Sequence, residues 1–380
     1  MSIQTKHLRT DNKLKDELYK SPSANINIYD IVVMCHLRWE FVYQRPQHII
    51  SRLSKDHKIL FIEEPIKKET KGHNLKILSQ NLHILQPNTD SIDEIGSILS
   101  DFLRNTRVPI GWFYSASFIP LLEQLEFDHI IYDCMDELSM FKGAPAHLIE
   151  QEKYLLAHTD IVFTGGKSLY ESKMQIHENV YCFPSSVDED HFASAKNGVA
   201  LPADIAAIPK PIAGYYGVVD ERLDLELLEK TAASNPDVSF VMIGPVVKIQ
   251  EDELPQADNI YYLGIKPYKV LPNYLKAFDI AMMPFALNDA TKFISPTKTL
   301  EYMAAGKPII STKIKDVERD YSHCIKLVSD SEEFTSQLQL LLNSNQEETQ
   351  DKDYKKVLEN TSWSNTVKSM ADIIQKVTKK

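Results

Sequence analysis

The residues best suited to chemistry lie in one short run: Ser295, Pro296, Thr297, Lys298 and Glu301. Ser is a common N-cap and Pro is favoured in the first helical turn, so we expect a helix over 296–305 that begins at this run. The amides of Thr297 and Lys298, with the Lys298 ammonium, would form an anion site. Glu301 follows on nearly the same face, where a carboxylate can accept hydrogen bonds from two ribose hydroxyls. The run predicts a nucleoside diphosphate site, although a capped helix with a surface Lys298–Glu301 pair gives the same pattern.

Further candidates follow predicted strands of the same half. Asp220 and Arg222 come after a turn at Gly217, and Lys248 follows the next strand. Cations at strand ends can stabilise the negative charge of a leaving diphosphate. Gly217 lets the backbone approach a ligand closely. The alternatives are a solvated loop lysine at position 248 and an ion pair of Arg222 with a nearby carboxylate (Glu221, Asp224 or Glu226).

Candidates of the first half also follow predicted strands. Asp136 follows the strand 129–133, where a carboxylate can deprotonate an acceptor hydroxyl or bind the donor sugar. His36, Arg38 and Arg45 follow the first strand, and Arg45 leads into a predicted helix. We interpret them as the lining of a site for an acceptor sugar or a lipid diphosphate. A turn aspartate and a purely structural loop are the alternatives.

Strands that alternate with amphipathic helices position these residues. In the first half we expect strands at 29–36, 58–63, 82–85, 109–114, 129–133, 161–164 and 180–183, with helices at 46–55, 92–105 and 145–158. In the second half we expect strands at 212–216, 238–243, 259–263, 279–283, 308–311 and 324–328, with helices at 225–233, 270–278, 296–305 and 332–342. Nearly continuous apolar runs such as IVVM are typical of buried parallel strands. The alternation predicts two tandem doubly wound sheets with a ligand cleft between them.

The same pattern predicts the domain organisation. We expect a polar tail over 1–25, a first domain over 26–193, a linker over 194–210 and a second domain over 211–355. The last segment, 356–380, would form a helix that crosses back to the first domain.

Composition excludes several classes of function. The chain of 380 residues has 42 basic and 53 acidic side chains, a net charge of -11, so we expect no general nucleic-acid binding. Its four cysteines form no CxxC pair, which disfavours a zinc site or a disulfide framework. A secretory signal and an apolar run of membrane-spanning length are both missing, so we expect a cytoplasmic protein, with peripheral membrane contact left open. GxGxxG, GxxxxGK[ST] and GxSxG motifs are absent.

The stretch from Ser295 to Thr312 resembles the donor-binding helix of GT-B glycosyltransferases, especially the group related to family 4 with its E-x7-E signature. Glu301 matches the second Glu, and Phe293 stands where the first would be. The segments GVVDERLD, GPVVKI and NIYYLG agree. With HLRWEFVYQRPQHI and YDCMDELSMFKGAP, they look most like bacterial glycosyltransferases of teichuronic acid and of capsular or exopolysaccharide synthesis. The resemblance covers about residues 28–375.

The resemblance implies a GT-B fold, in which two Rossmann-like domains face a central cleft. It implies hexosyl transfer from a nucleotide sugar, expected to be a UDP-sugar, to a glycan or lipid-linked acceptor of a bacterial surface polysaccharide. It implies no required metal ion and no cofactor other than the donor. Asp136 would then act in catalysis, although Met135 stands where many relatives have a His. A sugar-nucleotide epimerase of the same fold and a catalytically degenerate partner subunit are the alternatives.

Overall fold

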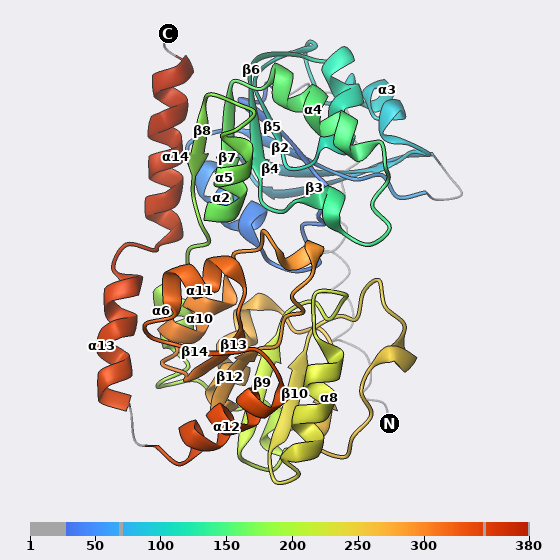
Figure 1. The fold of residues 1–380 in the computed structure, drawn as a ribbon. Helices are drawn as coiled ribbons and strands as arrows, with labels where there is room; N and C mark the ends of the chain where they lie inside the picture. Colours follow the sequence, from blue (N-terminus) through green and yellow to red (C-terminus); the bar gives the residue numbers. More distant parts are fainter. Residues whose placement is uncertain (1–27, 68–70, 345–346, 379–380) are drawn as a thin grey trace, which may run out of the picture. The chain divides into compact units, whose positions relative to one another are not determined.

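The computed structural model describes residues 28–67, 71–344 and 347–378 (Figure 1). The predicted tail over 1–25 lies outside these residues. Contacts along the chain divide it into two compact units. The first contains 28–133, 147–162 and 377–378, and the second contains 134–146 and 163–376.

The first sheet has eight strands in the order β3-β4-β2-β1-β5-β6-β7-β8. Their bounds are β1 Ile31–Cys35, β2 Ile59–Glu63, β3 Gly72–Ser79, β4 Leu82–Asn88, β5 Arg107–Phe113, β6 Glu126–Cys134, β7 Ile161–Thr164 and β8 Val180–Cys182. β1 is buried along its whole length and pairs in parallel with β2 and β5, as its continuous apolar run predicts.

One strand departs from the predicted parallel arrangement. β3 pairs antiparallel with β4 at the edge of the sheet, joined to it by Gln80 and Asn81. β3 was not predicted, because its half-exposed, partly polar residues lack the apolar run of a buried strand.

The helices of the first half are shorter than the helices predicted from the sequence. They are α2 Arg45–Leu53, η1 Ile92–Glu94, α3 Gly96–Leu99, η2 Ala116–Glu123, η3 Leu138–Met140, α4 Leu148–His158, α5 Lys167–Lys173 and α6 Glu189–Ala193. The predicted helix over 92–105 is wrong as a single element, because it breaks into η1 and α3 around Gly96. A Cβ at position 96 would clash with the side-chain amide of Gln124, so Gly serves close packing there at the expense of helix propensity.

The second sheet has six parallel strands in the order β11-β10-β9-β12-β13-β14. They are β9 Ile212–Tyr216, β10 Ser239–Ile243, β11 Ile260–Tyr262, β12 Ile280–Met283, β13 Ile309–Thr312 and β14 Lys326–Val328. All six predicted strands of this half are confirmed, with ends that differ by no more than about two residues. The strand order reverses between β9 and β12, which is the topological switch point of a doubly wound sheet.

The helices of the second half include several short ones that were not predicted. They are α7 Ala203–Ala206, α8 Leu225–Ser234, η4 Glu251–Glu253, η5 Tyr268–Val270, α9 Leu271–Ala277, η6 Asp289–Thr291, α10 Lys298–Ala304, α11 Lys315–Tyr321, α12 Ser331–Leu342, α13 Glu347–Leu358 and α14 Trp363–Thr378. α14 buries Trp363, Val367, Met370 and Ile374, which share one helical face. Thr366 of α14 is hydrogen-bonded to Ser186, shortly after β8, at 2.7 Å.

The sheets and the compact units divide the chain at different places. The last strand of the first sheet is β8 and the first strand of the second is β9, on either side of the predicted linker. Contacts, however, group 163–193 with the second unit. The domain bounds proposed from the sequence, and the crossing of the last helix, therefore stay predictions.

Candidate active site of the second unit

Two loops leave the switch point of the second sheet. The loop after β9 begins at Gly217 and carries Asp220 and Arg222, and the loop after β12 leads to Lys298. The loops are tied together, because the amide of Ala286 donates to the carbonyl of Arg222 at 2.8 Å. Ligands of open α/β sheets bind where such loops diverge at the carboxyl ends of the strands. The predicted nucleotide-sugar residues of both loops therefore occupy the expected place for a ligand.

The guanidinium of Arg222 is held along one edge by Asp220. Its Nε donates to Oδ1 at 2.9 Å and its Nη2 donates to Oδ2 at 2.8 Å, and Asp220 is buried. The ion-pair partner is thus Asp220 and none of the three carboxylates considered from the sequence. Among the described residues, no hydrogen bond is formed by Nη1. Asp220 therefore fixes the orientation of the Arg222 guanidinium along one edge, while the other edge can contact an anion.

Lys298 lies directly against Gly217. A Cβ at position 217 would clash with Cε of Lys298 and lie 2.7 Å from its Nζ, and the φ of Gly217 is 145°. The ammonium also lies 5.5 Å from the ring centroid of Tyr215 and 6.0 Å from that of Phe285. Burial lowers the pKa of Lys298 to about 8, although Glu301 and other carboxylates oppose the shift. Gly217 thus accommodates the lysine as well as the turn.

Glu301 is buried one helical turn beyond Lys298. Its Oε2 accepts a hydrogen bond from the Tyr216 hydroxyl at 2.7 Å, and its side chain is 6% exposed. Burial raises the pKa of Glu301 to about 7, whereas the Tyr216 hydrogen bond and Lys298 oppose this rise. No hydrogen bond to Oε1 occurs within the part of the chain that the structure describes. One carboxylate oxygen is therefore anchored and the other can accept from a ligand hydroxyl.

The start of α10 differs from the prediction. The helix begins at Lys298 with Thr297 at the N-cap, so Ser295 is not the N-cap and Pro296 is not the first helical residue. The carbonyl of Ser295 accepts from the Ser185 hydroxyl at 2.7 Å, and the first helical bond to a carbonyl of this run is Thr299 N–H to Pro296 O. Ser295 is therefore held in the preceding loop. α10 has seven residues, so the anion site depends on side chains more than on the helix terminus.

Asp136 belongs to the second unit although it follows β6 of the first sheet. Burial raises its pKa to about 6, and the raised value is opposed by the positive charges of Arg222, Lys298 and Lys248. The carboxylate thus lies within electrostatic range of all three predicted diphosphate cations. A carboxylate with a pKa near 6 is deprotonated at neutral pH and can act as a base.

Lys248 approaches the same place from the loop after β10. Its backbone adopts a φ of 64°, which is uncommon for a residue other than Gly. Its Nζ lies 4.7 Å from the ring centroid of Phe141, and the Arg222 Cζ lies 5.5 Å from the same centroid. The predicted cations Arg222 and Lys248 therefore share one aromatic neighbour.

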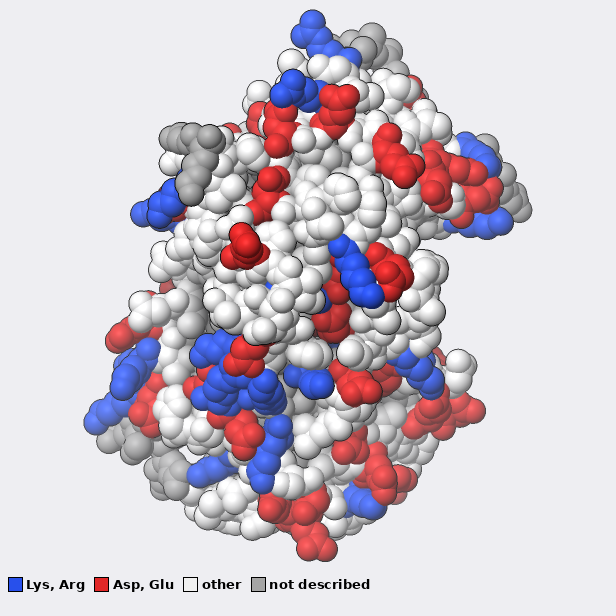
Figure 2. Space-filling view, turned by 45° about the horizontal axis from the view of Figure 1, so that its top comes forward, with Lys and Arg blue, Asp and Glu red and all other residues white. Residues whose placement is uncertain are grey.

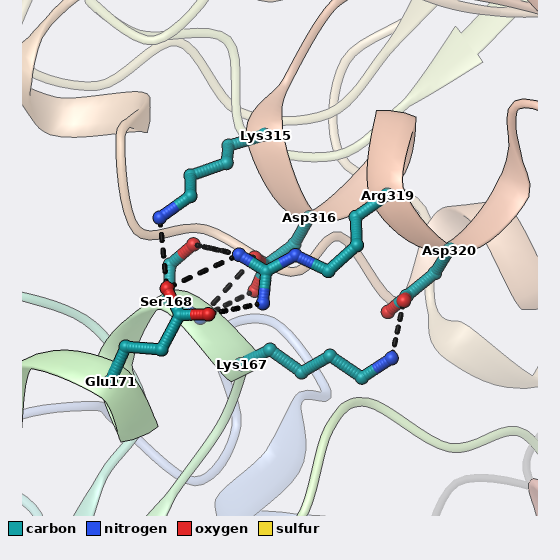
Figure 3. Close-up of polar contacts among 7 residues, drawn as sticks. All are labelled: Lys167, Ser168, Glu171, Lys315, Asp316, Arg319 and Asp320. Atoms are coloured by element: carbon teal, nitrogen blue, oxygen red, sulfur yellow. Dashed lines mark hydrogen bonds and ion pairs between the residues drawn. The ribbon is translucent and has the colours of Figure 1, made fainter. Parts of the chain in front are cut away.

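Figure 3 shows a network of polar contacts between α5 and α11. Asp316 is buried and accepts from both the amide and the hydroxyl of Ser168. Glu171 forms ion pairs with Lys315 and Arg319, and Lys167 pairs with Asp320. A Cβ at the neighbouring Gly166 would lie 2.7 Å from Asp316 Oδ2 and 3.1 Å from Ser295 Cβ. The network therefore packs the start of α5 closely against the Ser295 loop.

The predicted acceptor residues lie in the first unit, at the carboxyl edge of its sheet. Arg38 is 33% exposed and donates through Nη1 to Glu63 Oε2 at 3.1 Å and to the Glu64 carbonyl at 2.9 Å. His36 is half-buried at the end of β1. Burial raises the pKa of the neighbouring Glu64. The edge thus combines cationic and acidic groups, and the acceptor role of His36 and Arg38 stays a prediction.

Arg45, the third predicted acceptor residue, is paired with a buried carboxylate of the first unit. Its side chain is 6% exposed and its Nε donates to Asp133 Oδ1 at 2.9 Å, in a pair whose carboxylate is fully buried. Arg45 begins α2, as expected, and Gln44 stands at the N-cap. Because the guanidinium is neutralised inside the first unit, the arrangement favours a structural role for Arg45.

Two residues of the site were not named from the sequence. Phe141 contacts both loop cations, and Tyr216 holds Glu301. Tyr216 ends a buried strand, which indicated a core residue and gave no sign of its hydroxyl contact. Phe141 lies in the loop after β6, in which Asp136 was the only residue named as a candidate from the sequence. A pairing across 85 positions, such as that of Tyr216 with Glu301, has no local signature in the sequence.

Basic and acidic side chains are interspersed on the face drawn in Figure 2.

Within residues 28–67, 71–344 and 347–378, no group of three His, Cys, Asp or Glu side chains is placed to hold a metal ion. Across the described part of the chain, no helix combines the length and apolar character needed to cross a membrane.

Sequence comparison matches part of the second unit to a known family. Residues 222–344 match the family "Glycosyl transferases group 1". A curated relative, the putative teichuronic acid biosynthesis glycosyltransferase TuaH of Bacillus subtilis, is 23% identical over 228 residues. The match covers 55% of this chain and 56% of the relative, so it spans about half the length of that protein.

Solved structures share the architecture of the chain. Sucrose-phosphate synthase from Thermosynechococcus elongatus has a TM-score of 0.68 at 14% identity, covering 91% of this chain and 98% of its own. Anabaena HepE, solved in complex with UDP and glucose, has a TM-score of 0.64 at 12% identity, with coverages of 91% and 99%. Both are GT-B glycosyltransferases. The chain therefore has the GT-B fold, as the resemblance in its sequence predicted, and its residues 222–344 match the glycosyl transferases group 1 family.

Proposed function

We propose that the chain transfers a hexosyl group from a UDP-sugar to a glycan or lipid-linked acceptor in the synthesis of a bacterial surface polysaccharide. One observation carries the proposal: the positive charges of Lys298, Arg222 and Lys248 all act on the buried carboxyl group of Asp136, and Glu301 lies one turn beyond Lys298. These are the charges that a sugar nucleotide needs, with cations for its diphosphate and a carboxylate for its ribose.

The roles of the residues follow from the balance of the reaction. An acceptor oxygen forms a bond to the anomeric carbon of the donor sugar, and the bond from that carbon to the diphosphate breaks. Lys298 and Arg222 stabilise the charge that gathers on the departing diphosphate, helped by Lys248. Asp136 takes the proton of the acceptor hydroxyl. Glu301 accepts hydrogen bonds from the ribose through the oxygen that Tyr216 leaves available.

The choice of donor and acceptor has separate support. HepE binds UDP and glucose, and a structure of an Escherichia coli trehalose-6-phosphate protein with a TM-score of 0.64 contains UDP-2-fluoro glucose. The curated relative is named for teichuronic acid biosynthesis. The proposal includes a cytoplasmic location with peripheral contact at the inner face of the plasma membrane, where a lipid-linked acceptor is presented.

Calorimetry with UDP tests the diphosphate site. Lys298→Ala removes a charge-assisted contact worth about 1.5–3 kcal/mol, so UDP should bind about 10- to 150-fold more weakly. Lys230→Ala is the matched control, because Lys230 lies on the surface of α8 in an ion pair with Glu226. Unchanged UDP affinity of the Lys298 variant would contradict the proposed role of this lysine.

Product analysis separates the two alternatives. An epimerase would convert the nucleotide sugar without any acceptor, whereas a transferase releases UDP in proportion to the acceptor glycosylated. A degenerate partner subunit would show no UDP binding in the wild-type protein. A thermal-shift screen of UDP, GDP, dTDP and their sugars establishes the donor before acceptors are tried.

A further inference from the structure

The loop over 134–146 carries Asp136 away from the strand that precedes it. β6 ends at Cys134 and belongs to the first sheet, yet contacts group 134–146 with the second unit. After Asp136 the loop forms the short turn η3 and then reaches Phe141. Something other than the strand must therefore fix the carboxylate near the cations of the second unit.

One anchor lies on the sequence neighbour of Asp136. Glu137 Oε2 accepts from Lys173 Nζ at 2.8 Å, with side chains that are 10% and 2% exposed, and its Oε1 accepts from the Ser139 hydroxyl at 3.1 Å. This buried ion pair attaches the loop to the end of α5. A separate contact must hold the loop next to the diphosphate cations.

The second anchor is the contact of the Phe141 ring with the cations Arg222 and Lys248. The ring centroid lies 4.7 Å from Lys248 Nζ and 5.5 Å from Arg222 Cζ, and the Lys142 amide donates to Glu221 Oε1 at 3.0 Å. Cations within about 6 Å of a ring centroid are attracted to its face. Asp220 occupies one edge of the Arg222 guanidinium, so a phosphate can bind at the remaining edge without displacing the ring.

We propose that Phe141 is a positioning residue, which holds the Asp136 loop on the Arg222–Lys248 pair so that the base and the diphosphate cations act on one substrate. The inference rests on the proposed transferase function and adds a specific residue to it. Phe141 does not touch the reacting atoms. It acts through Asp136, which precedes it in the same loop.

Two substitutions distinguish the effect of the aromatic ring at position 141 from the effect of apolar volume. Phe141→Leu keeps an apolar side chain but loses the ring, so kcat should fall on the order of tenfold, while the donor KM and the UDP affinity stay within about threefold. Phe141→Tyr keeps the ring and should restore kcat to within about threefold of wild type. Thermal unfolding of each variant confirms that it is folded. A raised donor KM with unchanged kcat would overturn the proposal, because the ring would then shape the donor site instead.

A double substitution tests the partner of the ring. In a Lys248→Met background the ring has lost one of its two cations, so Phe141→Leu should reduce kcat by a smaller factor than in the wild type. Equal factors in both backgrounds would contradict the role of the Lys248 contact. The outcomes also separate the two proposals: wild-type kcat in Phe141→Leu, in a protein that binds UDP and transfers sugar, refutes the positioning role alone. A wild-type protein that neither binds UDP nor transfers sugar refutes the proposed function.

Discussion

The Lys298 ammonium occupies the space that a side chain at position 217 would need. A Cβ on Gly217 would lie 2.7 Å from Nζ and still closer to Cε. The turn after β9 and the first residue of α10 are therefore mutually dependent, although they are far apart in the sequence.

Gly217→Ala should displace the Lys298 side chain and weaken UDP binding at least about tenfold, since it disturbs a charge-assisted contact. The residue also has a φ of 145°, which strains any other amino acid. Gly72→Ala is the matched control, because Gly72 has a φ of 151° and no described atom lies within 4 Å of the place that a Cβ would take. Isothermal titration with UDP measures both variants. Equal losses in the two would show that backbone strain, and no clash with Lys298, is responsible.

Asp136→Asn should lower kcat by about 10²–10⁴-fold and leave the donor KM nearly unchanged, because the amide cannot accept the proton of the acceptor. Steady-state kinetics with the donor varied gives both constants. A variant that turns over at the wild-type rate removes Asp136 from catalysis.

The pH dependence should be bell-shaped. Burial raises the pKa of Asp136 to about 6, so kcat/KM should increase as the pH rises through 6 and the base loses its proton. Burial lowers the pKa of Lys298 to about 8, so kcat/KM should decrease as the pH rises through 8 and the ammonium loses its charge. Lys298→Arg keeps its charge at these pH values and should flatten the alkaline limb. A rate that does not vary between about pH 5 and pH 9 contradicts both assignments.

Treatment with EDTA should leave the transfer rate unchanged, because the side chains of Lys298, Arg222 and Lys248 stabilise the negative charge of the diphosphate in place of a metal ion. The rate is measured with and without chelator, then after adding Mn²⁺. Complete loss that Mn²⁺ restores would overturn the metal-free mechanism.

The α5–α11 network should contain one strong and one weak interaction. Asp316→Ala leaves the buried hydroxyl and amide of Ser168 without their acceptor, which should lower the free energy of unfolding by about 1–3 kcal/mol. Glu171→Gln removes partly exposed ion pairs with Lys315 and Arg319 and should cost at most about 1 kcal/mol. Urea unfolding of the two variants gives the comparison. A larger loss for Glu171→Gln would show that the exposed pairs dominate.

The strands of the second sheet could be predicted because each is a short apolar run bounded by turn residues. Ile212–Tyr216 and Ile280–Met283 are buried at every position, and such runs carry their own signal. β3 could not be predicted in this way, since an edge strand exposes one side and needs no continuous apolar run. The broken helix near Gly96 depends on contact with Gln124, which lies far along the chain.

The candidate site was partly predictable for a related reason. Arg222 and Lys298 follow strands of the second sheet, and the carboxyl ends of parallel strands gather on one edge of a sheet. Asp136 follows a strand of the other sheet, so this rule alone does not bring it to the same place. Which groups pair there is decided by packing. The partner of Arg222 is Asp220, and Arg45 is neutralised by Asp133, 88 positions away. The start of α10 also lies later than predicted, because the Ser295 carbonyl bonds to Ser185 instead of entering the helix.

The assignment of the 134–146 loop to the second unit limits how this chain can be divided. A fragment that began at residue 211 would retain Arg222, Lys248, Lys298 and Glu301 but would lose Asp136, the carboxylate on which the three cations act. Exchange of the downstream half between homologous genes would likewise transfer the groups that hold the donor and leave the proton acceptor with the other parent. The affinity for the donor and the rate of transfer would thus come from different parents. A working chimaera must take the 134–146 loop and the downstream half from the same parent.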